Sequence, residues 1–279
     1  MKAIINSLKR IHLFKASAAL FTYLLFMTLP SCQKDELKPV AAPDIDGLSS
    51  SALSKKTKIS YGKLKDVEGN IYKTVKIGKQ WWMAENLKTT RYNNGDLIGS
   101  TTPATLDITE ENRPKYQWVF NEDESNLATY GRLYTWYAVT DSRNVCPKGW
   151  HVSTDTEWTT LENYLIAHGY NYDGTTTGNK IAKSMAATNT WSPTDSPGTP
   201  GTDLSSNNSS GFTALPGGRR ESNGLFLYIE GDASWWSSTG LAQDTPDAWC
   251  WLLYCGASYL HRGSSSKPAA FSVRCVKGK

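Results

Sequence analysis

The residues best suited to chemistry lie close together in the stretch VCPKGWHVSTDTEW, residues 145–158. It carries Cys146, His151, Asp155 and Glu157, which are the residue types of a thiol active site or of a metal site. No known Cys/His signature places a base beside Cys146, and the sequence contains no HExxH, paired CxxC or EF-hand loop. We therefore predict that this stretch is structural, and that the chain has no catalytic residue, metal ligand or cofactor.

The acidic residues of this stretch fit the start of a helix. Thr154 and Glu157 have the spacing of a capping box, and Asp155 is favoured at the positive N-terminal end of a helix. Apolar residues then recur at helical spacing, followed by a glycine where a C-terminal cap is expected: Trp158, Leu161, Leu165 and Gly169. The sequence therefore predicts its best helix here, preceded by a short strand that contains His151.

Other segments predict mainly strands and loops. In NIYKTVKI, the residues Ile71, Val75 and Ile77 lie on one side of a strand, and we expect that side to face the core. Residues 128–141 are a second helix candidate. Residues 192–210 form a long polar loop rich in Pro and Gly, and a loop of this length is typically functional or disordered. Short apolar runs continue to the C-terminus and indicate successive strands with turns.

The first 31 residues have the pattern of a secretory signal. Four basic residues precede an apolar run of roughly 15 residues, which is shorter than the ~20 that a membrane-spanning helix needs. The run ends in LPSC, which resembles a bacterial lipobox with Cys32 as the lipidated residue; ordinary cleavage near Ser31 is the alternative. The following CQKDE resembles the signal that sends some lipoproteins to the cell surface. We expect an outer-membrane lipoprotein that is exposed on the cell surface.

The signal also explains the basic charge of the chain. The formal net charge is +4, and residues 1–31 carry four basic and no acidic side chains, so the mature protein is near 4 − 4 = 0. A nucleic-acid partner, which would need a basic surface, is therefore not expected. Residues 32–60 are polar and indicate a flexible tether, so the lipid anchor is the only contact with the membrane that we expect. Residues 61–279 can bury one large core as a single domain.

Several motifs of this domain, taken together, carry a family resemblance. They are DVEGNIYKTVKIGKQWWMAENLKTTRYNNGD, YGRLYTWYAV, VCPKGWHVSTDTEWTTLE, SSGFTALPGGRRESNGLF, ASWWSST and FSVRCVK, in that order. The chain thereby resembles the Fibrobacter succinogenes major paralogous domain, which also occurs in Bacteroides-type lipoproteins. The resemblance implies an α+β, C-type lectin-like fold with short antiparallel strands, one or two helices and long ordered loops. It implies no reaction, because the family is not defined by one.

The resemblance and the expected compartment together suggest one disulfide. C-type lectin-like folds commonly tie the last strand back to an earlier element with a disulfide. Two suitably placed cysteines in an oxidising envelope compartment are also expected to pair. Cys146 and Cys275, which lies in the predicted last strand FSVRCV, are the favoured pair.

A second set of cysteines supports an alternative, enzymatic hypothesis. The family fold is related to the formylglycine-generating enzymes, whose copper site also uses two nearby cysteines shortly before the closing strand. Cys250 and Cys255 occupy a similar place in CWLLYC, which leaves a copper-dependent cysteine oxidase as the runner-up. Residues five apart on a straight strand point to opposite faces and lie ~16 Å apart, so two small buried core residues are the simpler interpretation.

Calcium-dependent sugar binding is not predicted. The Glu-Pro-Asn and Trp-Asn-Asp motifs of calcium-dependent lectins are absent from the sequence. The run NEDESN, residues 121–126, could hold Ca²⁺ through carboxylate oxygens, but a solvated acidic turn is the simpler interpretation. The run SSSK, residues 264–267, lacks the helix context and the companion motifs of penicillin-recognising enzymes.

Aromatic and arginine side chains remain as the candidate ligand-binding surface. All eleven tryptophans lie in the domain, and exposed Trp or Arg suits stacking on sugars or anchoring a protein partner. Trp235 and Trp236 point to opposite faces of a strand, so we expect one in the core and the other nearer solvent. The candidate ligand-binding residues are Arg219, Arg220, Trp235, Trp236, Trp249, Trp251 and Tyr259. A core filled with tryptophan is the competing explanation.

These observations predict a ligand-binding or adhesion role, with a glycan or a cell-surface protein as the partner. The binding surface would combine the loop at about 192–210 with the aromatic and arginine residues. The alternatives are the copper-dependent oxidase and a structural subunit of a surface appendage, and self-assembly would favour the latter.

Overall fold

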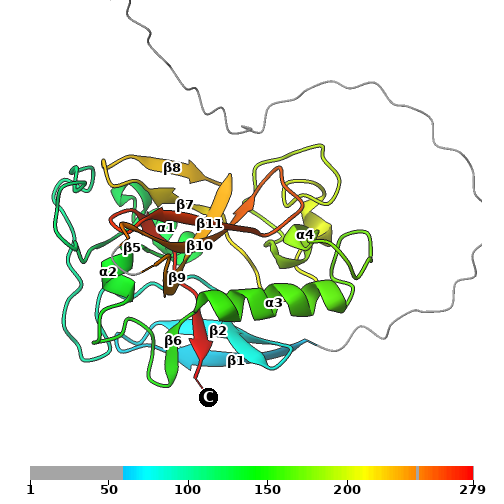
Figure 1. The fold of residues 1–279 in the computed structure, drawn as a ribbon, viewed down its shortest axis with the longest axis horizontal. Coiled ribbons are helices and arrows are strands. Elements are labelled where there is room, and N and C mark those ends of the chain that lie inside the picture. The colour runs from blue at the N-terminus through cyan, green and yellow to red at the C-terminus, as the bar shows by residue number, and fades with distance from the viewer. Residues whose placement is uncertain (1–58, 243–244, 279) are drawn as a thin grey trace, which may run out of the picture. The chain divides into compact units, whose positions relative to one another are not determined.

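The computed structural model describes residues 59–242 and 245–278 of the chain (Figure 1). The predicted signal, the lipidation candidate Cys32 and nearly all of the predicted tether lie outside these residues. Within them the fold is α+β, with many strands, few helices and mainly antiparallel pairing, as the sequence predicted. In the same described part, no helix combines the length and the apolar character that crossing a membrane requires.

The smaller of two sheets has five strands, in the order β1-β2-β3-β13-β6. Its strands are β1 (Ser60–Lys65), β2 (Ile71–Ile77), β3 (Gln80–Met83), β6 (Trp150–Val152) and β13 (Cys275–Lys277). The last strand of the chain is therefore inserted between β3 and β6, so the sheet is complete only when both ends of the domain have folded.

The larger sheet has eight strands, of which β8 pairs with β7 and the others follow the order β11-β10-β9-β7-β12-β5-β4. Its strands are β4 (Gln117–Trp118), β5 (Leu133–Thr135), β7 (Gly217–Arg220), β8 (Phe226–Ile229), β9 (Asp232–Gly240), β10 (Asp247–Tyr254), β11 (His261–Ser266) and β12 (Ala270–Phe271). The successive strands predicted toward the C-terminus are thus confirmed. The pairing of β7 with β9 is parallel, and the other pairings within this sheet are antiparallel.

Helix α3 (Asp155–Ala167) is the helix that the sequence predicted best. The Thr154 hydroxyl accepts the backbone N–H of Glu157, and the Glu157 carboxylate accepts the N–H of Thr154, which completes the capping box. Gly169 follows the helix end with a φ of +74°, where glycine is favoured. The shorter helices are α1 (Ser125–Tyr130), α2 (Trp136–Val139) and α4 (Ala182–Met185), with 3-10 turns η1 (Phe120–Glu122) and η2 (Leu204–Ser206).

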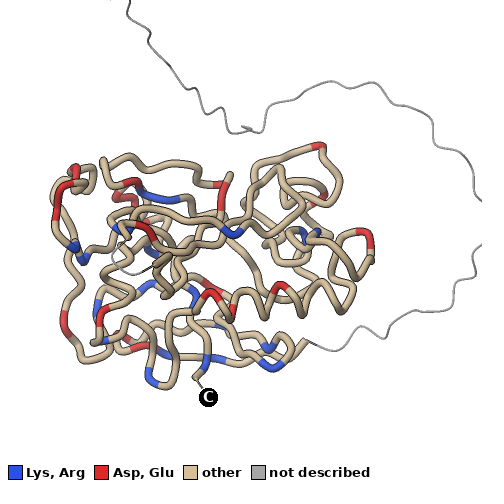
Figure 2. The backbone as a smooth tube through the Cα atoms, viewed as in Figure 1, with Lys and Arg blue, Asp and Glu red and all other residues tan. Residues whose placement is uncertain are grey.

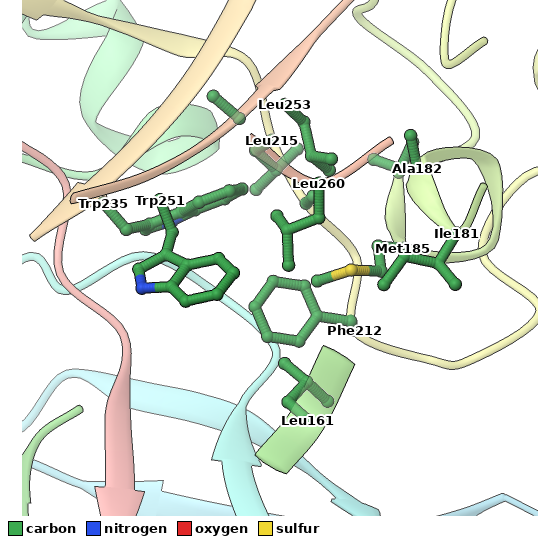
Figure 3. Close-up of a cluster of buried hydrophobic side chains, with 14 of the residues drawn as sticks. Leu161, Ile181, Ala182, Met185, Phe212, Leu215, Trp235, Trp251, Leu253 and Leu260 are labelled. Carbon is green, nitrogen blue, oxygen red and sulfur yellow. The ribbon is translucent and has the colours of Figure 1, made fainter. Parts of the chain in front are cut away.

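The apolar stripe of α3 packs against both sheets. Trp158 contacts Trp82 of β3, with ring centroids 4.8 Å apart, and Trp251 of β10, with ring centroids 5.9 Å apart. Figure 3 shows Phe212 in the same cluster, next to Leu161 of α3. Each large apolar side chain buried in this way contributes roughly 1.5–3 kcal/mol, so the cluster fixes the helix between the sheets.

A second core cluster contains the predicted disulfide. Cys146 and Cys275 are bonded, with an S–S distance of 2.08 Å and a Cα–Cα distance of 6.0 Å. Both are completely buried, and Tyr72, Trp236 and Phe271 belong to the same cluster. Because the bond joins residues 129 positions apart, it ties the last strand to the segment that leads into β6.

The core-facing side of β2 differs from the prediction. Val75 and Ile77 are buried as expected, but Ile71 is exposed and Tyr72 is buried. The reason is that core clusters cover the two faces of this strand at different points, since Val75 belongs to the cluster around α3 and Tyr72 to the disulfide cluster. The buried Tyr72 hydroxyl donates a hydrogen bond of 2.7 Å to Asp66.

The predicted helix at residues 128–141 is wrong. The chain forms α1, breaks at Gly131, continues as β5 and then forms α2. Gly131 has a φ of +75°, and a Cβ at this position would lie 2.7 Å from the carbonyl oxygen of Leu87. This close approach to another segment interrupts the helix, and Leu133 then pairs with Trp118 in the larger sheet.

A fully buried arginine links β3 to the loop before β7. The Nε of Arg274 donates to Asn86 Oδ1 at 2.7 Å. Its other guanidinium nitrogens donate to three carbonyl oxygens, those of Met83, Phe212 and Thr213. Backbone carbonyls on two segments, β3 and the loop before β7, thereby replace the water that the guanidinium loses on burial.

Asn86 is the centre of this buried network. Its Oδ1 accepts from Arg274 Nε and from Trp235 Nε1, which lies 3.0 Å away. Its Nδ2 donates to the carbonyl oxygen of Tyr130 and to Ser272 Oγ. Each hydrogen-bonding position of the Asn86 amide is therefore used.

The long polar loop, residues 192–210, is folded onto itself. Hydroxyl groups of Thr194, Thr199 and Thr202 hydrogen-bond to one another, with distances from 2.6 to 3.1 Å. Asn207 Nδ2 is buried and donates to two backbone carbonyl oxygens. These contacts hold the loop in one conformation.

We predict that Asn86→Ala lowers the free energy of unfolding by about 3 kcal/mol or more, because it leaves the Arg274 and Trp235 N–H groups buried without an acceptor. Urea unfolding followed by tryptophan fluorescence measures the change. Asn189→Ala, at an exposed asparagine, is the matched control and should change the free energy by less than about 0.5 kcal/mol. Equal effects of the two substitutions would contradict the network's importance.

We also predict that replacing Cys146 and Cys275 together by alanine lowers the free energy of unfolding by about 2–5 kcal/mol, because the unfolded chain loses a long covalent loop. Cys250→Ala removes another buried cysteine side chain without breaking this bond, and it should cost about 1 kcal/mol. Denaturant unfolding of the three proteins compares them. A loss no larger than that of Cys250→Ala would show that the bond adds little.

Candidate functional site

Three of the tryptophans predicted to bind a ligand are buried. Trp235, Trp236 and Trp251 have almost no exposed surface, so the expectation that one of the first two lies nearer solvent is wrong. Trp235 belongs to the cluster around α3, while Trp236 stacks on Phe271 at 4.4 Å and donates its Nε1–H to the carbonyl oxygen of Tyr134. The larger sheet is covered on both faces at this point, so a surface ligand cannot reach these rings.

Arg220 is buried as well and serves the backbone. Its guanidinium donates to the carbonyl oxygens of Ala104, Leu106 and Glu221. It also lies 4.1 Å from the centre of the Trp118 ring. These contacts fasten the loop around residue 105 to β7 and leave Arg220 unavailable to a ligand.

Trp249 is half-buried, and Arg262, which forms an ion pair with Asp155, lies over its ring. The guanidinium of Arg262 lies 3.4 Å from the centre of the Trp249 ring. The same guanidinium makes two hydrogen bonds, of 2.9 and 2.8 Å, to the Asp155 carboxylate, which also accepts from Trp251 Nε1. Asp155 therefore connects the start of α3 to β10 and β11, in addition to its favourable place at the helix start.

The remaining candidates, Arg219 and Tyr259, belong to a group of polar and aromatic side chains at one end of the larger sheet. We call this group the tyrosine–arginine cluster, and it consists of Arg219, Tyr228, Asp232, Tyr254, Tyr259 and His261. Arg219 lies 3.1 Å from Asp232 and 4.4 Å from the centre of the Tyr228 ring. A second acid, Glu221, accepts from Arg219 Nε at 2.6 Å.

Strand register brings the members of this cluster together. Asp232 of β9 is paired with Tyr254 of β10, and His261 of β11 is paired with Leu252, two residues before Tyr254. Because alternate residues of a strand share a face, Asp232, Tyr254 and His261 project from the same face of the sheet. The His261 ring lies 5.9 Å from Tyr254 and 6.2 Å from Tyr259, measured between ring centroids.

The carboxyl group of Asp232 has a raised pKa. Burial raises the pKa of Asp232 to about 6, although the neighbouring Arg219 opposes the shift. Burial, together with the nearby Asp232 carboxylate, also raises the pKa of Tyr254 to about 12. At neutral pH the cluster therefore holds an ionised Asp232 paired with Arg219, beside phenol groups that can donate hydrogen bonds.

The cluster is accessible where the predicted tryptophans are not. Tyr228 is 46% exposed and Tyr259 is 44% exposed, whereas Arg219 and Asp232 lie largely below the surface. The long loop borders this end of the sheet, since the Gly201 N–H donates to the carbonyl oxygen of Cys255, next to Tyr254. Tyr228, beside the held ion pair, and Tyr259, beside His261, can stack on a ligand and hydrogen-bond to it.

The two cysteines of the oxidase hypothesis do not form a common site. Cys250 is a buried free thiol in the disulfide cluster, and burial raises its pKa to about 12, so it is not a thiolate at neutral pH. Cys255 belongs to the cluster around α3 and is not a free thiol. Over the described residues, no group of three or more His, Cys, Asp or Glu side chains is arranged to hold a metal ion.

The acidic residues near the predicted helix and turn have structural partners. His151 Nε2 lies 2.8 Å from Glu157, which is also the acid of the capping box. In the acidic turn, the Glu122 carboxylate accepts the N–H of Ala104 and the Asp123 carboxylate accepts the N–H of Ser125. These contacts engage the carboxylates in local structure.

The sequence identified two members of the tyrosine–arginine cluster and missed the others. Tyr228, Asp232, Tyr254 and His261 come from four strands, and only the pairing of β9, β10 and β11 places three of them on one face. A strand-by-strand alternation analysis with a correct pairing order would have found them. Three of the four candidate tryptophans lie in the core instead.

Comparison with known proteins identifies a family. The profile of a family described as the Fibrobacter succinogenes major domain matches residues 75–277. That range runs from within β2 to the end of β13 and includes the whole tyrosine–arginine cluster. No curated protein and no solved structure matches the chain.

We predict that Asp232 makes stability depend on pH between about 4 and 6. Its pKa rises from 3.8 in the unfolded chain to about 6 in the folded protein, so the folded state binds the extra proton and loses stability as pH rises through this window. Asp232→Asn cannot ionise, and its free energy of unfolding should fall less over the same window, by on the order of 1–3 kcal/mol. Urea unfolding of both proteins from pH 4 to 7 measures the difference. Parallel pH profiles would contradict the raised pKa.

Proposed function

The chain belongs to the Fibrobacter succinogenes major domain family, and on this premise we propose that it is a cell-surface lipoprotein that binds a glycan through the tyrosine–arginine cluster. The family consists of surface-associated paralogous domains. In this proposal Cys32 carries the lipid in the outer membrane, residues 32–60 are the tether, and residues 61–279 form a C-type lectin-like binding domain. The signal-like N-terminus and LPSC support the anchor.

The observation that carries the proposal is the half-exposed ring of Tyr228 beside a held ion pair, with a second half-exposed ring, Tyr259, in the same cluster. Tyrosine rings can stack on the apolar C–H face of a sugar ring, and the phenol can donate a hydrogen bond to a hydroxyl group. Arg219 and Asp232 add further donors and acceptors at fixed positions, because each is already held by the other. A site whose charges are paired internally suits an uncharged, hydroxyl-rich ligand.

A cell-surface protein is the other partner class that the same features would accept. Aromatic and arginine side chains also anchor protein interfaces. The glycan is favoured because Arg219 is engaged by both Glu221 and Asp232, which leaves it no free charge for an acidic partner. Most members of the cluster lie on strands, which hold side chains in place more precisely than loops do. This also suits the repeating sugar units of a glycan.

We predict that the full chain, carrying Cys32→Ala to keep it soluble, binds at least one glycan on an array, and that Tyr228→Ala and Tyr259→Ala each weaken this binding roughly tenfold. The loss of one stacking ring has about this effect. Titration of the best array ligand by calorimetry measures it.

Tyr61→Ala is the matched control, because Tyr61 is 44% exposed but lies on β1 of the smaller sheet. It should leave glycan affinity unchanged. No binding to any glycan by the wild-type chain, or equal losses in all three variants, would overturn the proposed site.

A further inference from the structure

The hairpin formed by β1 and β2 gathers lysines on one face. In its register Lys63 stands opposite Lys73, and Lys65 stands opposite Ile71. Tyr61 stands opposite Val75, so these odd-numbered residues share one face of the sheet. Figure 2 shows Lys and Arg positions along this part of the backbone, at the lower edge of the view.

The lysines on this face form no ion pair within the described residues. Lys63 and Lys73 are exposed and directly opposite each other, a placement that destabilises a sheet through like-charge repulsion. Among the described residues, no carboxylate forms an ion pair with Lys63, Lys65 or Lys73. Glu85, which lines the hollow on this face, pairs with Lys88 and accepts the Lys73 backbone N–H. An external anion bound between the ammonium groups of Lys63 and Lys73 would relieve the repulsion.

Apolar side chains accompany these lysines. Ile71 is 62% exposed, although it lies in a strand, and Val67 at the hairpin turn is 47% exposed. Tyr61 is also exposed, and the Lys73 ammonium lies 3.8 Å from the centre of its ring. A shallow hollow on this face is lined by Tyr61, Gly62, Lys63, Ile71, Lys73 and Glu85. The face therefore combines positive charge with exposed apolar surface.

We propose that this hairpin face docks on a membrane surface that contains anionic phospholipids. Lysines near such a surface are each worth about 1 kcal/mol, and Ile71, Val67 and Tyr61 would enter the boundary between head groups and acyl chains. Free phosphate would satisfy the lysines but would leave the apolar side chains without a role. The charge and the apolar surface together select the lipid.

The place where the chain enters the domain supports this occupant. Residues 1–58 join the domain at Ile59, immediately before β1, so any anchor in that segment brings a membrane within reach of this hairpin. In Figure 1, β8 lies on the opposite side of the view from β1. Docking through the hairpin would therefore leave Tyr228 on β8 facing away from the membrane, free for a ligand.

The test is co-sedimentation of the full chain, made with Cys32→Ser so that no acyl chain contributes, with two kinds of vesicle. The protein should bind vesicles of phosphatidylcholine with about one third phosphatidylglycerol and should not bind phosphatidylcholine alone. Replacing Lys63 and Lys73 by alanine should lower the partition coefficient roughly tenfold or more. Adding Ile71→Ser should lower the partition coefficient again, including at high salt, where the attraction between charges is screened.

Lys76→Ala with Lys79→Ala is the matched control, because it removes the same charge from exposed positions, of which Lys76 projects from the opposite face of β2. It should change binding less than about twofold. The variant without Lys63 and Lys73 should also have an unchanged or higher Tm, since it loses a repulsive pair, so its weaker binding cannot come from unfolding.

Three outcomes would overturn the proposal. One is no binding to the anionic vesicles by the chain with both lysines present. Another is an equal loss in the two double variants, which would indicate attraction by overall charge. The third is release of the protein by inorganic phosphate but not by sodium chloride of equal ionic strength, which would indicate a small-anion site.

Discussion

The arrangement of the two sheets depends on one buried hydrogen-bond network, which surrounds the guanidinium of Arg274. A guanidinium taken out of water without a carboxylate partner is costly unless its N–H groups find acceptors. Here the acceptors are Asn86 and carbonyl oxygens on β3 and on the loop before β7, so all of them must be in place together. Burial lowers the pKa of Arg274 to about 9, which still leaves it charged at neutral pH. The network therefore selects one arrangement of the sheets and the loop.

The aromatic core follows from the same arrangement. Trp235 is held by Asn86, and Trp158 of α3 packs against it in the cluster between the sheets. Because most of the tryptophans fill the core, the exposed aromatic side chains are tyrosines, namely Tyr61, Tyr172, Tyr228 and Tyr259. The division is physical, since a phenol hydroxyl tolerates contact with water better than a large indole ring.

The two proposed surfaces use different parts of this framework. The tyrosine–arginine cluster lies at one end of the larger sheet, where β7, β8, β9, β10 and β11 contribute its side chains, except for Tyr259 in the loop before β11. The lysine face lies on the hairpin of the smaller sheet, next to the point where the chain enters the domain. Both are built mainly on paired strands, so backbone hydrogen bonds fix most of their geometry. A membrane contact at one surface would leave the other accessible.

The sequence by itself determined the features that depend on neighbouring residues. The capping box of Thr154 and Glu157, the apolar stripe of α3 and the short strands toward the C-terminus follow from local spacing, and the family follows from the order of its motifs. The pairing of Cys146 with Cys275 was implied by the resemblance and is present.

Tertiary structure alone decided the rest. Trp235 and Trp236 are both buried because both faces of β9 are covered, and Gly131 ends a helix because it meets Leu87. Asp232 and Tyr254 lie side by side on one face because β9 pairs with β10 in one register. What covers a face, and which strand lies beside which, are relations between distant segments, and local periodicity carries no information about them.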